Sequence, residues 1–145
     1  MKMILILALV ALASSCVAFT PTSEDRAWFD DFNHYWFVLG SYANLMSNST
    51  DDMASMKKYF DLLANDSREA FWSSRKQTVS PELRKAKTNY EFGLLSFQKG
   101  GEKFSRGYVQ NDKKLMADGL NRFSKGLEYM NLTDLAVEAQ SPSIS

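Results

Sequence analysis

Cysteine, histidine and proline are nearly absent from this chain of 145 residues, which contains one cysteine, one histidine and three prolines. The single cysteine, Cys16, cannot form an intramolecular disulfide, so the stability of the folded chain must come from packing. The prolines Pro21, Pro81 and Pro142 stand near the ends of segments, and strand alternation with regularly spaced turn residues is lacking. This distribution predicts an all-helical protein.

The single histidine also restricts the chemistry that the chain can perform. Metal sites in bundle cores combine several carboxylates with histidines, and a serine–histidine–aspartate triad would have to use His34 alone. The chain has no Gly-x-Ser-x-Gly elbow, no phosphate-binding glycine loop and no Cys-x-x-Cys-His haem motif. The sequence therefore predicts no catalytic, metal-binding or cofactor-binding residue, and a protein that is not an enzyme.

The chain also lacks an excess of charge of either sign. It contains 17 lysine and arginine residues and 17 aspartate and glutamate residues, so its formal net charge is zero. This balance gives no electrostatic basis for binding nucleic acid. Hydrophobic residues make up 45% of the chain and aromatic residues 13%, which is enough for one domain to bury a core. We expect a single domain over residues 22–140 and a disordered tail over 141–145.

The strongest positive pattern is a repeat of large residues and glycines at intervals of seven. The large residues are Tyr90, Phe97 and Phe104, followed by Met116, Phe123 and Met130. Glycines stand three residues after five of these positions, at Gly93, Gly100, Gly107, Gly119 and Gly126. Residues 93–102 also match residues 119–128 at six of ten positions.

A seven-residue apolar period is typical of helices that pack nearly parallel or antiparallel, as in a coiled coil. Glycine inside a helix costs about 0.5–1 kcal/mol relative to alanine, so five glycines need an offsetting gain. Close approach of two helix backbones would supply that gain, and we interpret the glycines as a packing seam. The alternative is that they break helices into loops, and Gly100-Gly101 is the strongest candidate for such a break.

Apolar spacing and capping residues predict four helices, over residues 22–47, 51–77, 80–109 and 112–130. The second helix is either one helix with a kink or two helices joined at Asn65. Ser80 precedes Pro81 and is expected to cap the third helix. Thr133-Asp134 is expected to start one more short turn. Short connections favour an antiparallel up-down-up-down four-helix bundle with the glycine seam between the third and fourth helices.

The first 18 residues are predicted to be a secretory signal segment. Lys2 precedes an apolar run over residues 3–13 that is too short to span a bilayer as a helix. Two processing routes remain open. A signal peptidase could cut after Ala18, or Ala13-Ser14-Ser15-Cys16 could act as a lipobox, which would make the signal 1–15 and place lipid on Cys16.

Asn48, Asn65 and Asn131 each begin an Asn-x-Ser/Thr triplet, the acceptor sequence for N-glycosylation. All three triplets fall at predicted turns or at the weak point of the second helix. Because Asn, Ser and Thr are also common at helix caps, the alternative is that the triplets serve only as caps.

These observations favour an exported structural or interaction protein, extracellular or at the cell surface, with a membrane tether if Cys16 carries lipid. Its partner would be another envelope protein or a second copy of the chain. The alternative is a binding module that holds a hydrophobic small molecule or haem in the bundle core. For such a ligand we expect a space between the first two helices, lined by Trp36, Met53, Met56 and Phe60.

Overall fold

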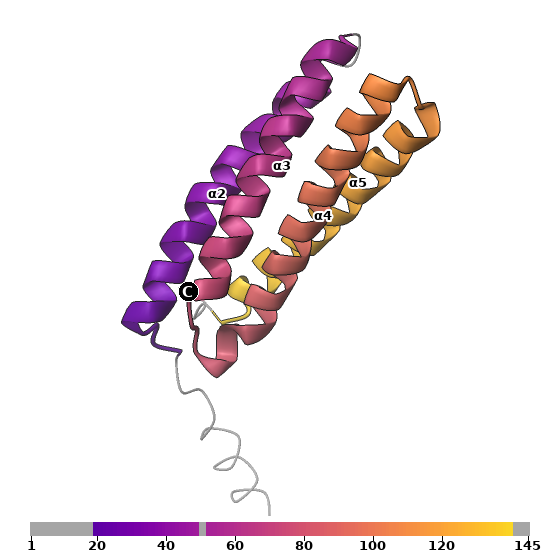
Figure 1. Ribbon diagram of the computed structural model, residues 1–145. Coiled ribbons are helices and arrows are strands. Elements are labelled where there is room, and N and C mark those ends of the chain that lie inside the picture. Colours follow the sequence, from indigo (N-terminus) through magenta and orange to yellow (C-terminus); the bar gives the residue numbers. More distant parts are fainter. Residues whose placement is uncertain (1–18, 50–51, 141–145) are drawn as a thin grey trace, which may run out of the picture.

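The computed structural model describes residues 19–49 and 52–140, and within these residues it contains four α-helices and no strand. The helices are α2 (Ser23–Ser47), α3 (Met53–Lys76), α4 (Arg84–Gln110) and α5 (Lys113–Glu138), and a short 3-10 helix, η1 (Pro81–Leu83), precedes α4. Figure 1 shows that the chain runs up, down, up and down through the four helices. The predicted all-α antiparallel four-helix bundle is therefore confirmed.

Side-chain caps at the helix starts explain three of the four boundaries. Thr22 caps α2, where its Oγ1 accepts from the Asp25 N–H at 3.1 Å. Asp52 caps α3, and Asp112 caps α5 by accepting from the Leu115 N–H at 3.0 Å. Before Asp112, Asn111 adopts a left-handed backbone with φ of 53°, which ends α4. Two residues thus suffice to reverse the chain between α4 and α5.

Two helices extend through residues that the sequence pattern treats as interruptions. α3 is one helix through Asn65-Asp66-Ser67, so the alternative of two helices joined at Asn65 is wrong. Ser67 is buried, and its small side chain fits the α3 core face. α5 continues to Glu138, eight residues beyond its predicted end at 130. Thr133 is fully buried there, and its Oγ1 donates to the Tyr129 carbonyl at 2.9 Å, so this polar residue fits inside the helix.

The start of the third helix also differs from its prediction. Ser80 makes no side-chain capping bond, and the residues after it form the 3-10 turn η1 before α4 begins at Arg84. The backbone N–H of Ser80 instead donates to Asp25 Oδ1 at 2.8 Å. A contact with the start of α2, which lies 55 residues away in sequence, therefore organises this connection.

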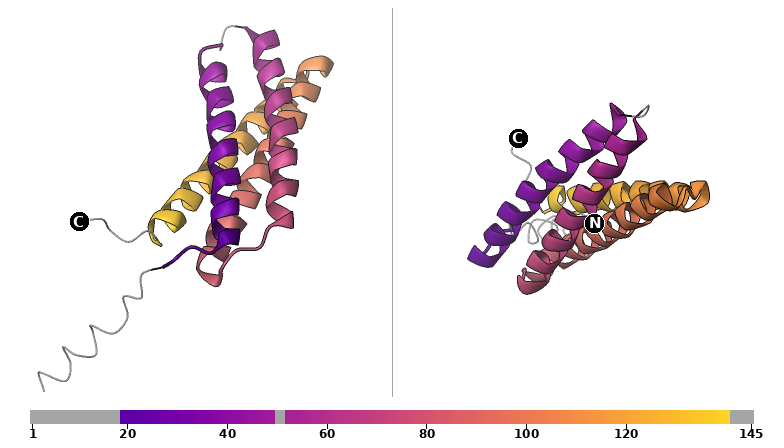
Figure 2. Two further views of the ribbon diagram at one scale, coloured as in Figure 1. Left: turned by 90° about the vertical axis from the view of Figure 1, so that its left-hand side faces the viewer. Right: turned by 45° about the horizontal axis from the view of Figure 1, so that its top comes forward.

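The four helices form two hairpins that cross at an angle. Packing is extensive between consecutive helices, whereas α2 has at most marginal backbone contact with α5. Figure 2 shows the α4–α5 hairpin turned relative to the α2–α3 hairpin. Among the helices that the structure describes, none lies beside one side of α2.

Aromatic rings fill the interior where the two hairpins meet. Near the start of α2, the ring of Tyr90 lies edge-on to Trp28 at 6.0 Å and to Phe32 at 5.1 Å. Further along the bundle, Phe60 stacks on Phe104 with ring centroids 4.2 Å apart. All five of these residues are buried, and burial of such rings is the main favourable contribution to folding.

Candidate functional site

The glycines of α4 and α5 form a layered contact between the two helices. Each layer pairs a glycine with a large residue of the other helix: Gly93 with Met130, Phe97 with Gly126, Gly100 with Phe123, Phe104 with Gly119, and Gly107 with Met116. Moving three or four residues up α4 corresponds to moving the same number back along α5. The predicted glycine seam therefore lies between the third and fourth helices.

The backbones approach so closely in this seam that a side chain on several of its glycines would not fit. A Cβ at Gly119 would lie 2.7 Å from the Phe104 nitrogen and 2.8 Å from the Gly100 carbonyl oxygen. Gly101 faces the other way, where a Cβ would lie 2.8 Å from the Cβ of Ala64 in α3. Gly100 and Gly101 are thus inside one helix and serve two different neighbours, so the alternative that they break the helix is wrong.

Buried and half-buried carboxylates connect helices rather than form a reactive pair. Asp25 is fully buried and accepts from the backbone N–H groups of Thr22 and Ser80. Burial alone would raise its pKa, but these hydrogen bonds outweigh burial and hold the pKa of Asp25 below its ordinary value. Asp25 is therefore an anion that joins the start of α2 to the connection before α4.

Two further contacts join α2 to α3. Asp31 accepts from the Ser73 hydroxyl and, at 2.8 Å, from the Gln77 amide. Tyr42 donates its hydroxyl proton to Asp66 Oδ2 at 2.6 Å. Partial burial, and then the hydrogen bond to this carboxylate, raises the pKa of Tyr42 to about 12. Both contacts therefore hold α2 against α3.

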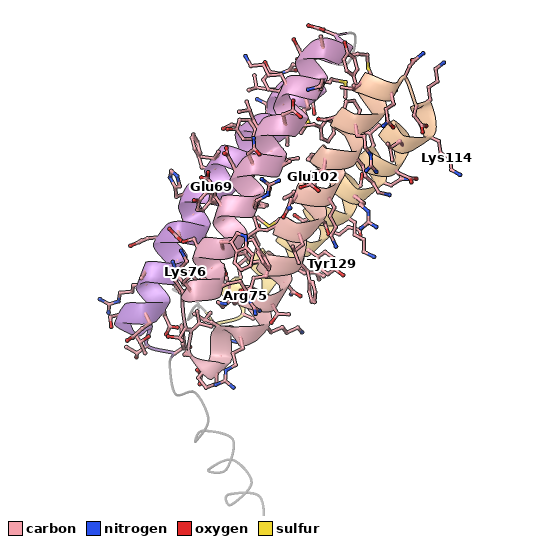
Figure 3. The ribbon with its side chains drawn as sticks, viewed as in Figure 1. Glu69, Arg75, Lys76, Glu102, Lys114 and Tyr129 are labelled. Atoms are coloured by element: carbon pink, nitrogen blue, oxygen red, sulfur yellow. The ribbon has the colours of Figure 1, made fainter. Side chains whose placement is uncertain are left out.

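Ion pairs connect α3 to α4 along their common edge. Arg68 contacts Glu102 at 2.9 Å, and Glu102 lies on the α4 side that faces α3 in Figure 3. Glu91 accepts from Lys87 and Ser74, and lies 3.6 Å from Arg75. Within residues 19–49 and 52–140, no group of three or more His, Cys, Asp or Glu side chains could hold a metal ion.

The residues that were expected to line a core ligand site lie in different parts of the structure. Phe60 is buried against Phe104 and Phe123, while Met53 is exposed at the start of α3. Trp36 stacks on Phe32 and lines a hollow on the outer side of α2. These residues therefore do not enclose one cavity. His34 is exposed, with its ring edge-on to Tyr35 at 5.2 Å.

The predicted modification sites lie in three different settings. Cys16 and the tail 141–145 are outside the residues that the structure describes. Asn48 is the exposed residue that ends α2. Asn65 and Asn131 are exposed too, but both lie inside helices. The predicted placement of Asn131 at a turn is therefore wrong, whereas Asn65 lies in the second helix as expected, without a break there. Their partner residues Ser67 and Thr133 are fully buried.

The outer side of α2 carries an aromatic face that none of the other helices within residues 19–49 and 52–140 covers. We call this the α2 face: Trp36, Phe37, Gly40, Ser41 and Asn44, which line an open hollow of about 410 Å³. The Phe37 side chain is 77% exposed, and a Cβ added at Gly40 would meet no atom within 4 Å. No Asp, Glu, Lys or Arg occurs between Asp31 and Asp51, so the face is uncharged. Exposed apolar patches of this kind commonly mark contact sites.

Sequence reasoning based on the seam missed this face, although a signal for it exists. Phe37 precedes Gly40 by three residues, the same spacing that relates Phe97 to Gly100 and Phe123 to Gly126. The pattern gives only a weak signal in the first helix, because it occurs there once and has no seven-residue repeat.

A second hollow, of about 390 Å³, lies between the start of α4 and the end of α5. Its walls include Leu132 and Leu135 on one side and Lys85 and Glu82 on the other. Leu135 is 61% exposed, but charged groups border this hollow, which distinguishes it from the neutral α2 face.

The chain was compared with protein-family models, with curated protein sequences and with solved structures, and none matches. Across the described parts of the chain, no helix has both the length and the apolar content needed to cross a bilayer. The fold thus defines the protein as a four-helix bundle with an antiparallel glycine seam.

Proposed function

We propose that this protein is an exported helical bundle that acts by contact and has no enzymatic activity. The observation that carries the proposal is a contrast between interior and surface. Aromatic rings and close glycine contacts fill the interior. The carboxylates that accept hydrogen bonds there, such as Asp25, join one helix to another part of the chain. Outside, α2 presents an uncharged aromatic face to solvent. Because exposing Phe37 is unfavourable in water, this face is better explained by a contact than by stability.

The proposed location is the cell surface or the extracellular space. Its support is the short apolar run after Lys2 and the small residues that precede Phe19. If Cys16 carries lipid, the bundle would be tethered to a membrane, and its contacts would be with other envelope proteins or with further copies of itself. Glycans on Asn48, Asn65 and Asn131 would point into solvent, since all three side chains are exposed.

Export is tested by measuring the mass of the protein purified from its native source, under denaturing and native conditions. A chain that starts at Phe19, or a lipid-modified chain that starts at Cys16, would support the proposal. A Cys16→Ser variant separates the two routes, because it removes the lipid acceptor but keeps a small residue before Ala18. An unprocessed intracellular chain would overturn the proposal, and a ligand lost only on denaturation would favour the binding module.

Action by contact is tested with a photo-crosslinking residue at position 37 of the exported chain, irradiated on intact cells. A matched control carries the same residue at the exposed position of Glu128 on α5. We expect adducts of defined mass from position 37 and few from position 128. Equal, diffuse labelling from both positions would contradict a contact role for the α2 face.

A further inference from the structure

The five layers of the α4–α5 seam show how this chain pairs helices. In three layers a large side chain of one helix lies against a glycine of the other, with Met130 at Gly93, Phe97 at Gly126 and Met116 at Gly107. At Gly100 and Gly119 the nearest atoms are backbone atoms of the facing helix. Two such units in antiparallel orientation are complementary to each other. The spacing that makes them so is a large residue followed by glycine three positions later.

The α2 face carries this unit without a partner. All six other glycines would bring an added Cβ within 3.4 Å of another atom, whereas Gly40 alone has open space. Phe37, three residues earlier, is the most exposed of the large hydrophobic residues of the described chain. A glycine inside a helix lowers helix stability. At Gly40 no close packing within the described chain offsets this loss of stability.

We propose that the α2 face binds a second copy of this chain, with the two α2 helices antiparallel across a twofold axis. Phe37 of each copy then lies over Gly40 of the other, as Phe97 lies over Gly126 in the seam. A twofold contact places the same patch on both sides, so a charged patch would repel itself. The α2 face has no full charge between Asp31 and Asp51, which removes that penalty.

The pairing of Phe37 with Gly40 also determines which residues of the two copies face each other on either side of it. If Phe37 lies opposite Gly40 of the other copy, Asn33 lies opposite Asn44, and both are exposed. A contact through one helix from each copy is smaller than a standard stable interface, so we expect a weak dimer with a Kd in the range of about 10 µM to 1 mM. The inference deepens the proposed contact role by naming its partner, and it rests on that role.

The first experiment is sedimentation equilibrium of the exported chain from about 1 µM to about 1 mM. The test variant is Gly40→Leu, because the open space at Gly40 lets the monomer accept leucine without a clash. We expect the variant to keep or raise the melting temperature while its Kd rises at least about tenfold. Leu135→Gln, which changes an equally apolar surface residue outside the α2 face, is the control and should dimerise like the wild type. A wild-type chain that stays monomeric throughout overturns the inference.

The second experiment tests orientation. Asn33→Cys and Asn44→Cys are made separately in a chain that lacks Cys16, mixed in equal amounts and oxidised. The antiparallel pairing predicts that the mixed disulfide forms in preference to either homodimer, whereas random collision gives all three products and contradicts it. Failure here remains distinct from failure of the proposed function, because photo-crosslinking from position 37 to a different envelope protein would retain the contact role and exclude only the second copy.

Discussion

The ring of Phe97 lies directly against Gly126, so closely that a Cβ at position 126 would be 2.5 Å from Cδ1 and Cε1 of that ring. Real Cβ atoms do not approach carbon to this distance, so any side chain at 126 must displace the ring or separate the helices. The contact joins α4 to α5 at a residue whose intrinsic helix propensity is poor. At Gly126 the low helix propensity of glycine therefore disfavours the helix, and the close packing against Phe97 outweighs that effect.

The glycines should respond to alanine according to what surrounds each of them. Gly119→Ala places Cβ against backbone atoms of α4 that cannot move independently, and we expect a loss of about 1–3 kcal/mol in the free energy of unfolding. Gly93→Ala meets the flexible end of Met130 and should cost less. Gly40→Ala meets nothing and should gain about 0.5–1 kcal/mol. Urea unfolding of dilute protein measures all three, and an equal effect at Gly119 and Gly40 would contradict the seam.

Asp25 should make stability depend on acid pH. Its pKa is lower in the folded state, so its contribution is complete above the unfolded value of about 3.9 and is lost as the pH falls through the folded value. We expect Asp25→Asn to lose about 1–3 kcal/mol at pH 7, because two buried N–H groups lose a charged acceptor. The gap between variant and wild type should narrow below about pH 4. Asp30→Asn, at an exposed position, is the control and should have little effect.

Tyr42 should make the stability of the fold depend on alkaline pH. Its folded pKa is about 12, above the unfolded value of about 10, so its contribution is present below pH 10 and is lost as the pH rises through the folded value. Tyr42→Phe should cost about 1 kcal/mol at pH 7, since the hydrogen bond to Asp66 is lost. Equilibrium unfolding from neutral to alkaline pH checks this, with the exposed Tyr108→Phe as control. A constant difference across that range would show that the hydrogen bond does not respond to ionisation.

The three acceptor triplets should differ in when they can be glycosylated. A transferase that reads the whole triplet cannot reach Ser67 or Thr133 in the folded bundle, because both are fully buried. We therefore expect modification of Asn65 and Asn131 only before folding, whereas Asn48 stays open to modification afterwards. Peptide mass mapping after treatment of folded and of urea-unfolded protein with an oligosaccharyltransferase tests the difference. Efficient modification of Asn65 in the folded chain would contradict the burial of Ser67.

Much of this fold is predictable from the sequence because it rests on local rules. Thr22, Asp112 and the seven-residue spacing act over a few residues, and they place the helices and the seam. The errors arise where a distant contact decides the outcome. Ser80 makes no side-chain cap, and its backbone N–H donates to Asp25, 55 residues away. Thr133 differs, because its hydroxyl bonds locally to the Tyr129 carbonyl within the helix, and its burial in the bundle is the part that the local sequence does not show.

The candidate site was less predictable than the fold. Whether Phe37 is core or surface depends on where α5 lies relative to α2, and that angle follows from how the two hairpins pack. The sequence shows an aromatic residue with a glycine three positions later, but it does not show that the other described helices leave both of them uncovered. Exposure of this face is a property of the assembled bundle, so only the structure reveals it.

The alternation in the α4–α5 seam has a consequence for how its register is chosen. Sliding one helix by half of its seven-residue repeat would move Met130 and Phe97 away from Gly93 and Gly126, the glycines that leave room for these side chains. Sliding it by a full repeat would again set large residues against glycines, so the seam alone permits both alignments. The two-residue reversal at Asn111 and Asp112 is too short to allow the slip. The seam therefore holds the two helices together, and the turn determines which of its equivalent alignments they adopt.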